Sequence, residues 1–255
     1  MRHTRLYRGD AVVLRQRNLG EADRILVLYT QQRGKLSAVA KGIRRPRSRL
    51  AGSLQLFSHA SLQLAAGRSL EVITQAKAVN LHYRLRQEVE RYAHASYVAE
   101  LLDALVDDGQ PDEYLFNVLT ETLQGMDVGG DPATLTRAFE IKQLSRLGYG
   151  PELDTCTACG GPLAPNAQGF SVVQGGVVCA KCARSQGAVP LSKGAHRAMK
   201  DLRAIDMRQL ATRQLSPAIK GELVQVLRGF VDYHLHRPLR SAAFLSEDKK
   251  EMSEG

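Results

Sequence analysis

The stretch DAVVLRQRNLGEADRILVLYTQQRGKLSAVA, residues 10–40, carries the pattern that decides the fold of the N-terminal part. Its apolar residues come in short runs, and each run ends in a polar or glycine-bearing segment, which is typical of β-strands separated by turns. The same pattern continues to residue 78, and around Leu62 the apolar residues recur mostly two apart, as in a strand with one buried face. The predicted strands are 10–17, 23–29, 36–40, 54–64 and 70–78.

Five short strands predict a small β-barrel. An OB-fold barrel is favoured because its nearly closed sheet leaves few exposed edges, and its loops present a groove for oligonucleotides. An SH3-like barrel has the same number of strands, and periodicity alone does not separate the two folds.

From Asn80 the apolar residues change to a helical period. Apolar residues every three or four positions predict helices near 89–105, 115–123 and 135–147. Ser192 is expected to cap a helix through Arg203, and Ser216-Pro217 to begin a helix that Pro238 breaks. We therefore expect an α+β multidomain protein: an OB-fold nucleic-acid-binding domain, a helical domain in two parts, a zinc-binding module set within the helical domain, and a disordered tail. The expected bounds are 1–80, 81–150, 151–190, 191–245 and 246–255.

The net positive charge is confined to the first 80 residues. This segment has 15 Lys and Arg against 4 Asp and Glu, whereas the other 175 residues have 20 against 22. A glycine-bearing, flexible loop holds most of the excess and suits a polyanion, because phosphate contacts release condensed counterions. A solvated basic surface and an anionic membrane are alternatives, although no amphipathic or lipid anchor supports the membrane. The candidate phosphate-binding residues are Lys35, Lys41, Arg44, Arg45, Arg47 and Arg49.

The composition limits how bases could be recognised. Only 5% of the residues are aromatic and tryptophan is absent, so stacking rings are few. The N-terminus lacks the apolar core of a secretory signal and no long apolar run occurs, so we expect a soluble cytoplasmic protein.

All four cysteines form two Cys-x-x-Cys pairs, Cys156/Cys159 and Cys179/Cys182, separated by nineteen residues. This spacing is typical of a structural zinc site with four thiolate ligands. Two disulfides are the alternative, which a cytoplasmic location disfavours. The valine-rich segment between the pairs predicts a short hairpin that depends on metal for its order.

No motif argues for catalysis. Nucleotide-binding glycine loops, the zinc protease motif and the serine hydrolase motif are all absent. His234 and His236 do not share a helix face, and Glu21 and Asp23 are interpreted as surface or turn residues. We treat a second basic group, Lys193 to Arg203, as a solvated helix face; the alternative is that it extends the phosphate-binding surface of the barrel.

The stretch GEADRILVLYTQQRGKLSAVAKGIRRPRSR, residues 20–49, resembles the N-terminal signature of the RecO family of bacterial recombination mediators. The resemblance continues through LSRLGYGPELDTC, the four cysteines and YHLHRPLRS, and so covers nearly the whole chain. The matching residues of the signature are Gly20, Glu21, Asp23, Thr30, Gly34, Lys35, Lys41, Gly42 and Arg44.

The resemblance implies an OB domain, a helical domain and a zinc module. It also implies a non-catalytic, nucleoid-associated DNA repair protein that binds single- and double-stranded DNA and anneals complementary strands. Its implied partner is RecR, with which it loads RecA onto DNA coated by single-stranded DNA-binding protein; that coating protein is a further candidate partner. A zinc-ribbon RNA-binding or translation-associated factor is the alternative, and a metal-dependent nuclease is a third class that the missing acidic cluster disfavours.

Overall fold

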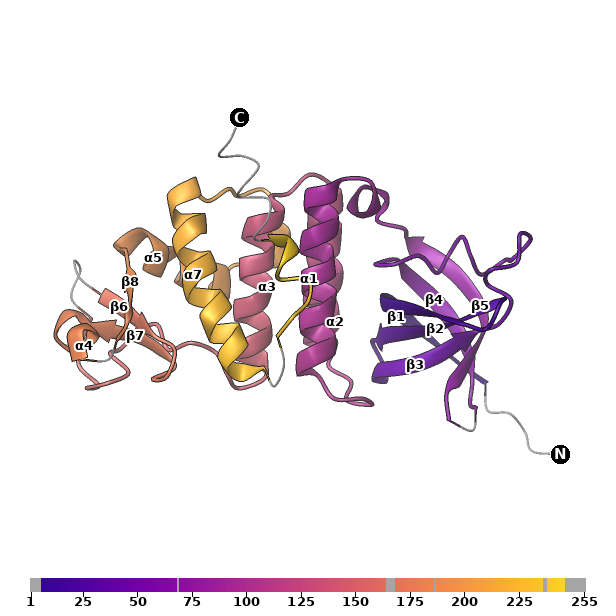
Figure 1. The fold of residues 1–255 in the computed structure, drawn as a ribbon, viewed down its shortest axis with the longest axis horizontal. Coiled ribbons are helices and arrows are strands. Elements are labelled where there is room, and N and C mark those ends of the chain that lie inside the picture. The colour runs from indigo at the N-terminus through magenta and orange to yellow at the C-terminus, as the bar shows by residue number, and fades with distance from the viewer. Residues whose placement is uncertain (1–5, 68, 164–167, 186, 236–237, 246–255) are drawn as a thin grey trace. The chain divides into compact units, whose positions relative to one another are not determined.

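The computed structural model describes residues 6–67, 69–163, 168–185, 187–235 and 238–245. The chain divides into two compact units, Met1–Asp127 with the residues from Ala243 onward, and Val128–Ala242. Figure 1 labels their helices and strands. The α+β prediction is confirmed: a five-stranded barrel precedes the helices, and a three-stranded sheet lies in the same part of the chain as the four cysteines. The five-part division given above stays a prediction.

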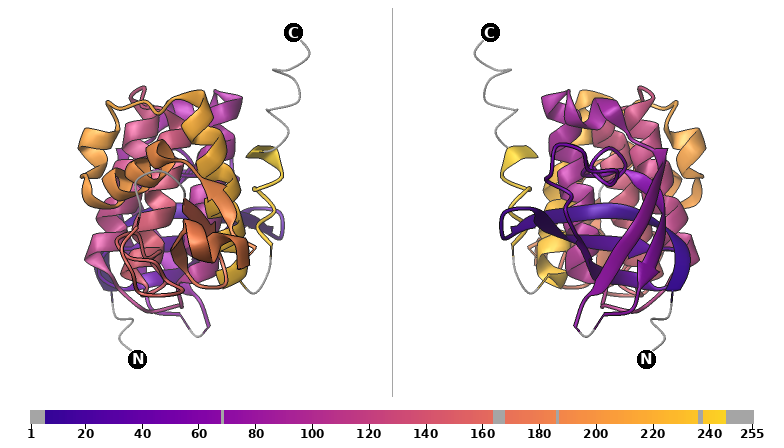
Figure 2. Two further views of the ribbon diagram at one scale, coloured as in Figure 1. Left: turned by 90° about the vertical axis from the view of Figure 1, so that its left-hand side faces the viewer. Right: turned by 90° about the vertical axis from the view of Figure 1, so that its right-hand side faces the viewer.

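The first unit begins with the barrel, onto which Figure 2 looks in its right-hand view. The strand order is β1-β2-β3-β5-β4, all neighbours being antiparallel except β3 and β5. This is an OB-like closure, and it decides against the SH3-like alternative. The strands are β1 (Leu6–Leu19), β2 (Asp23–Thr30), β3 (Gly34–Ala40), β4 (His59–Ala65) and β5 (Glu71–Asn80).

The fourth strand differs from its prediction. Residues 54–58 are loop and turn, and β4 begins only at His59. Leu54 is nevertheless fully buried, because it is part of the barrel core and not of the sheet. The alternating apolar residues at 54–64 therefore include a core residue from the loop, Leu54, as well as the residues of the strand itself.

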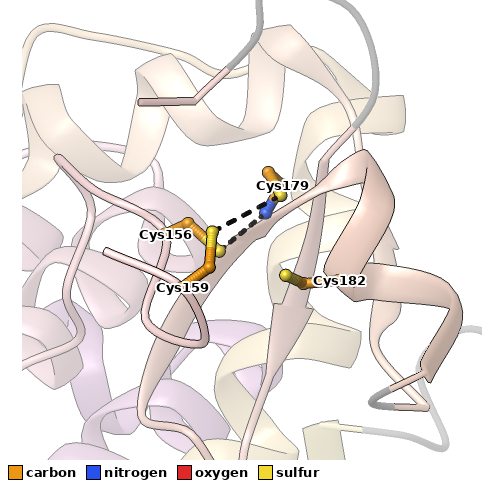
Figure 3. A group of neighbouring side chains, drawn as sticks. All are labelled: Cys156, Cys159, Cys179 and Cys182. Atoms are coloured by element: carbon orange, nitrogen blue, oxygen red, sulfur yellow. Dashed lines mark hydrogen bonds between the residues drawn. The ribbon is translucent and has the colours of Figure 1, made fainter. Parts of the chain in front are cut away.

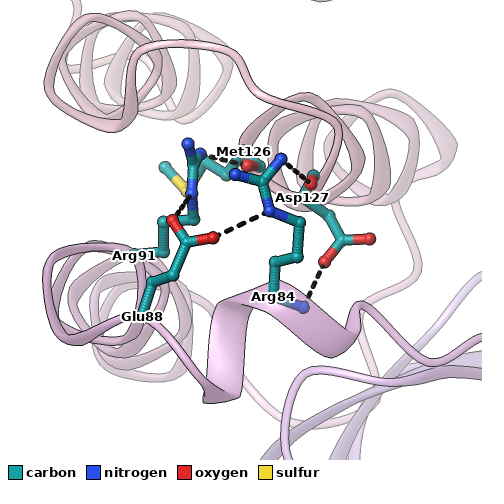
Figure 4. A network of polar contacts seen from close by, with 5 residues as sticks. All are labelled: Arg84, Glu88, Arg91, Met126 and Asp127. Atoms are coloured by element: carbon teal, nitrogen blue, oxygen red, sulfur yellow. Dashed lines mark hydrogen bonds and ion pairs between the residues drawn. The ribbon is translucent and has the colours of Figure 1, made fainter.

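Two helices and a short 3-10 helix complete the first unit: η1 (Tyr83–Arg86), α1 (Val89–Leu105) and α2 (Glu113–Asp127). Arg84 of η1 and Arg91 of α1 both bond to residues at the C-terminal end of α2 (Figure 4). Arg91 donates to the carbonyl of Met126 and pairs with Glu88. Arg84 also pairs with Glu88, at 2.8 Å, and its backbone N–H donates to Asp127 at 2.9 Å. Cations at the last carbonyls of a helix satisfy groups that have no partner within the helix.

The second unit places a bundle of helices beside a small sheet. Ser192 and Ser216 cap α5 and α7 as predicted, each accepting a hydrogen bond from the N–H three residues later. The helices are α3 (Pro132–Arg146), α4 (Ala180–Ser185), α5 (Lys193–Ala204), α6 (Met207–Leu210) and α7 (Pro217–His234). The predicted hairpin is β6 (Gln168–Ser171) with β7 (Gly176–Cys179), and β8 (Val189–Leu191) adds a third strand that the sequence did not predict. Residues 236–237 and the predicted tail, 246–255, lie outside the described residues.

Candidate nucleic-acid interface and metal centre

The outer face of β1 and β2 is covered in the first unit. Val12, Val27 and Tyr29 are buried although they are not part of the barrel core. The Phe116 ring of α2 lies 6.4 Å from the ring of Tyr29, and α1 contacts β1. OB barrels commonly bind oligonucleotides on strands 2 and 3. Here the helices take up much of that face. The exposed cations lie instead on the loop between β3 and β4, residues 41–58, which we call the basic loop.

The turn between β1 and β2 holds the start of the basic loop. A carboxylate oxygen of Asp23 accepts a hydrogen bond from the Gly42 N–H at 2.7 Å, and Ala22 accepts one from the Arg44 N–H at 3.0 Å. Gly42 has a φ of 65°, which a side chain would strain. Asp23 is the first residue of β2, and its carboxylate holds the turn that begins the basic loop.

Two apolar residues anchor the basic loop to the barrel. Ile43 and Leu54 both belong to the barrel core and are 4% and 0% exposed. The loop is thus held to the barrel near its start and again towards its end, in contrast to the flexible loop that the glycines suggested. Four exposed cations lie between these anchors, Arg44, Arg45, Arg47 and Arg49, and a fifth, Lys41, lies just before the first anchor. The fold therefore fixes a cationic surface at one end of the barrel.

Lys35 has different surroundings from the other five candidates. It lies on β3, and its ammonium is 2.7 Å from the carbonyl of Asp103, 3.4 Å from the carboxylate of Asp103 and 3.5 Å from that of Asp108. Its side chain is only 14% exposed. Because two carboxylates already compensate this charge, we expect Lys35 to join β3 to α1 and to contribute least to phosphate binding.

Arg17 and Arg24 join this end of the barrel from β1 and β2, and the sequence reasoning missed them. The guanidinium of Arg24 donates to Gln16 at 2.8 Å and to Asn18 at 3.2 Å, both neutral side chains, and Arg17 is exposed. The strand register pairs Arg24 with Ala40, next to the start of the basic loop. The antiparallel order of β1, β2 and β3 is the signal that could have found these two residues.

The second basic group is not a freely solvated face. Lys200 and Arg203 pair with the two carboxylate oxygens of Asp154 at 2.6 Å and 2.9 Å, and His196 lies 2.7 Å from the carbonyl of Leu153. Hydrogen bonds from Lys200 and Arg203 lower the pKa of Asp154 to about 2. The shared face of α5 therefore binds the segment that leads into the cysteines.

The four cysteines meet as their spacing predicted (Figure 3). Their sulfur atoms lie within 4.8 Å of one another, and the sulfurs of Cys159 and Cys179 are 4.0 Å apart. A tetrahedral site with 2.3 Å metal–sulfur bonds requires sulfurs about 3.8 Å apart. The donor set and spacing therefore fit a closed metal site.

Local backbone geometry brings the two pairs together. The first pair lies on a turn in which the Gly160 N–H donates to the Cys156 carbonyl at 2.8 Å. The second pair spans the end of β7 and the start of α4. Gly176 permits the close approach of Glu152, because an added Cβ would lie 2.4 Å from the Glu152 oxygen.

The surroundings of the sulfurs shift the pKa values of the thiols. Burial raises the pKa of the Cys156 thiol, but N–H groups of Cys179, Cys159 and Ala158 donate to its sulfur and lower that pKa to about 6. Hydrogen bonding with the Cys179 and Cys159 side chains raises the pKa of Cys182 to about 12. The four sulfurs can all be thiolates at once only when a bound cation neutralises them.

Within the described residues, no helix is both long and apolar enough to cross a membrane. The family model described as "Recombination protein O N terminal" matches residues 1–82, and "Recombination protein O C terminal" matches residues 86–243. The chain is 41% identical to "DNA repair protein RecO" of Symbiobacterium thermophilum, covering 94% of this chain and 96% of that protein. It is 39% identical to "DNA repair protein RecO" of Pelotomaculum thermopropionicum, covering 94% of both chains. On these matches and on the fold that carries them, the chain belongs to the RecO family of bacterial DNA repair proteins.

Proposed function

We propose that this protein is a recombination mediator that binds single- and double-stranded DNA through the basic loop. The observation that carries the proposal is the set of five exposed cations held on a loop that the barrel core anchors. Such a surface binds phosphates of any sequence through salt-sensitive contacts, and few base-edge contacts are needed. Binding of this kind is reversible by salt and by competing partners, as a mediator requires.

The proposed activity is annealing of complementary strands, without catalysis. Cations between two strands reduce the repulsion of their phosphates, so that bases can pair. Membership of the RecO family supports this role, together with RecR and single-stranded DNA-binding protein as partners and RecA as the recombinase that is loaded. We propose that the protein acts in the bacterial cytoplasm, at the nucleoid.

The proposed metal is one zinc ion held by Cys156, Cys159, Cys179 and Cys182. Thiolates are ligands that zinc prefers, and four of them leave no open position for a substrate. The ion would neutralise the sulfurs and join the two Cys-x-x-Cys pairs, so its role would be structural.

The basic loop is tested by the triple substitution R44A/R45A/R47A. We expect weaker binding to single-stranded DNA and a slope of log affinity against log salt that is smaller by about 2, since each phosphate contact on a single strand contributes about 0.7. The measurement is fluorescence anisotropy of a labelled oligonucleotide at several salt concentrations. The matched control removes three exposed cations from the second unit, K193A/R197A/R213A, and should leave the slope unchanged.

An unchanged slope in R44A/R45A/R47A would remove the basic loop from the DNA interface. Annealing of two oligonucleotides, one coated with single-stranded DNA-binding protein, then tests the activity, and the triple variant should anneal more slowly than the control. Preference for a hairpin RNA over single-stranded DNA in competition would contradict the DNA assignment and favour an RNA-binding factor.

A further inference from the structure

Exposed apolar side chains gather around the start of α1 in the first unit. Tyr83 is 61% exposed, Tyr92 45%, Val79 57% and Val89 77%. They come from the end of β5, from η1 and from the first turns of α1. The four side chains lie within fourteen residues of sequence, and contiguous exposed apolar patches on soluble proteins are often binding surfaces.

This surface adjoins the end of the basic loop. The rings of Phe57 and Tyr92 are 5.7 Å apart in an edge contact, and Arg86 donates to the carbonyl of Leu56 at 3.1 Å. Phe57 and Leu56 are the last apolar residues of the loop whose first part holds the exposed cations. One loop therefore connects the cations to the tyrosines.

The tyrosines are held in place. Phe57 has a φ of 66°, and this left-handed backbone is fixed by its N–H donating to Val13 at 2.9 Å and by His82 at 2.9 Å from its carbonyl. The guanidinium of Arg86 lies 5.4 Å from the centre of the Tyr83 ring. Strained backbone that surrounding contacts maintain is often found at functional sites.

We propose that Tyr83 and Tyr92 are stacking sites for unpaired bases of a single DNA strand whose phosphates contact the basic loop. The proposal rests on the function proposed above and adds a means of distinguishing single strands from duplex. Every base offers a flat apolar face, so stacking on tyrosine needs no particular sequence. Bases within a duplex are already stacked on their neighbours and gain nothing from these rings.

The charges nearby favour a nucleic acid over an apolar protein surface as the ligand. The surface continues into a loop with five exposed cations, and the guanidinium of Arg86, which donates to the Leu56 carbonyl, adds a further positive charge beside Tyr83. A protein partner remains a distinct outcome of the test, because it would use the tyrosines without any effect on DNA.

The test compares Tyr83→Ala and Tyr92→Ala with the conservative variants Tyr83→Phe and Tyr92→Phe in the full chain. The probes are a single strand that contains 2-aminopurine, whose fluorescence falls on stacking, and a duplex of equal length. We expect each alanine variant to bind the single strand about tenfold more weakly and to quench 2-aminopurine less. Phenylalanine should restore both, and duplex affinity should change less than about twofold. Tyr233→Ala, which removes a ring 57% exposed in the second unit, is the matched control.

Folded alanine variants that bind and quench like the unmodified protein would overturn the proposal. If R44A/R45A/R47A still weakens binding, only the stacking sites are wrong; if it does not, the basic loop is wrong as well. Tyr92 touches Phe57, so a variant at this position can lose stability. Tyr83→Ala alone then decides, because this side chain is the more exposed.

Discussion

Lys35 and Arg45 are both cations of the first unit, yet only Arg45 faces solvent. Asp103 and Asp108 surround the ammonium of Lys35, whereas Arg45 is exposed on the basic loop. Asp154 shows the same dependence on neighbours from the acidic side, because Lys200 and Arg203 bind both of its oxygens. The role of a charged side chain is thus set by the groups that the fold places within a few ångströms of it.

Asp154→Asn should lower the free energy of unfolding by about 0.5 kcal/mol at neutral pH, a small effect because the pair is exposed and screened by water. The Lys200 and Arg203 hydrogen bonds lower the pKa of Asp154 to about 2 in the folded protein, against about 3.9 in an unfolded chain. This stabilisation is therefore present above pH 4 and is lost as the pH falls towards 2. Chemical denaturation of both proteins from pH 7 to pH 3 measures it, and a difference that grows on acidification would contradict it.

The C-terminal end of α2 depends on side chains from η1 and α1. Arg91 is mostly buried at 12% exposure and donates to the carbonyl of Met126, whereas Arg84 is 47% exposed. A helix leaves its last carbonyls unpaired, so a buried donor at this point matters more than an exposed ion pair. Arg84 also holds η1, which carries Tyr83, against the end of α2 through Asp127 (Figure 4).

Arg91→Ala should reduce the free energy of unfolding of the first unit by about 1–2 kcal/mol, because it leaves a helix carbonyl without its donor. Arg91→Lys should restore little, since a single ammonium cannot reach Glu88 and Met126 as a planar fork does. Arg84→Ala is the control and should cost about 0.5 kcal/mol or less. Thermal unfolding measures the stability of both alanine variants. Equal losses in the two would show that burial of the donor is not the cause.

The two units of the chain depend on different sources of stability. The barrel has a core of its own, with Leu26, Leu28 and Leu62 at most 2% exposed. The module around the cysteines has short strands of four, four and three residues. Small modules of this kind obtain much of their folding free energy from a metal ion.

Removal of metal by a chelator should therefore unfold the cysteine module and leave the barrel intact. Hydrogen exchange should accelerate at the amides of β6 and β7 and stay slow in β1 and β2. Mass spectrometry of the native protein should find one zinc ion per chain, and Cys182→Ser should bind it more weakly. Slow exchange in β6 and β7 after complete metal removal would instead mean that the module is stable by itself.

The pattern of residues along the chain determined much of this protein. Turn residues between short apolar runs predicted the barrel strands, because side chains of a strand alternate between two faces. Serines before Ala195 and Ile219 predicted two helix starts, since a cap is a local interaction. The spacing of the four cysteines predicted that their sulfurs meet.

Only the tertiary structure decided which surfaces are open. Phe116 of α2 covers Tyr29, which lies 87 positions before it. Lys35 bonds to Asp103, 68 positions later, and Tyr92 contacts Phe57, 35 positions earlier. Arg137 and Glu140 likewise form a buried ion pair on α3. The apolar periodicity of this segment predicted the helix but not the burial of its charged side chains. Local patterns report how a segment folds, because capping and alternation act over a few residues. They do not report what packs on it, because that depends on segments that only the folded chain brings together.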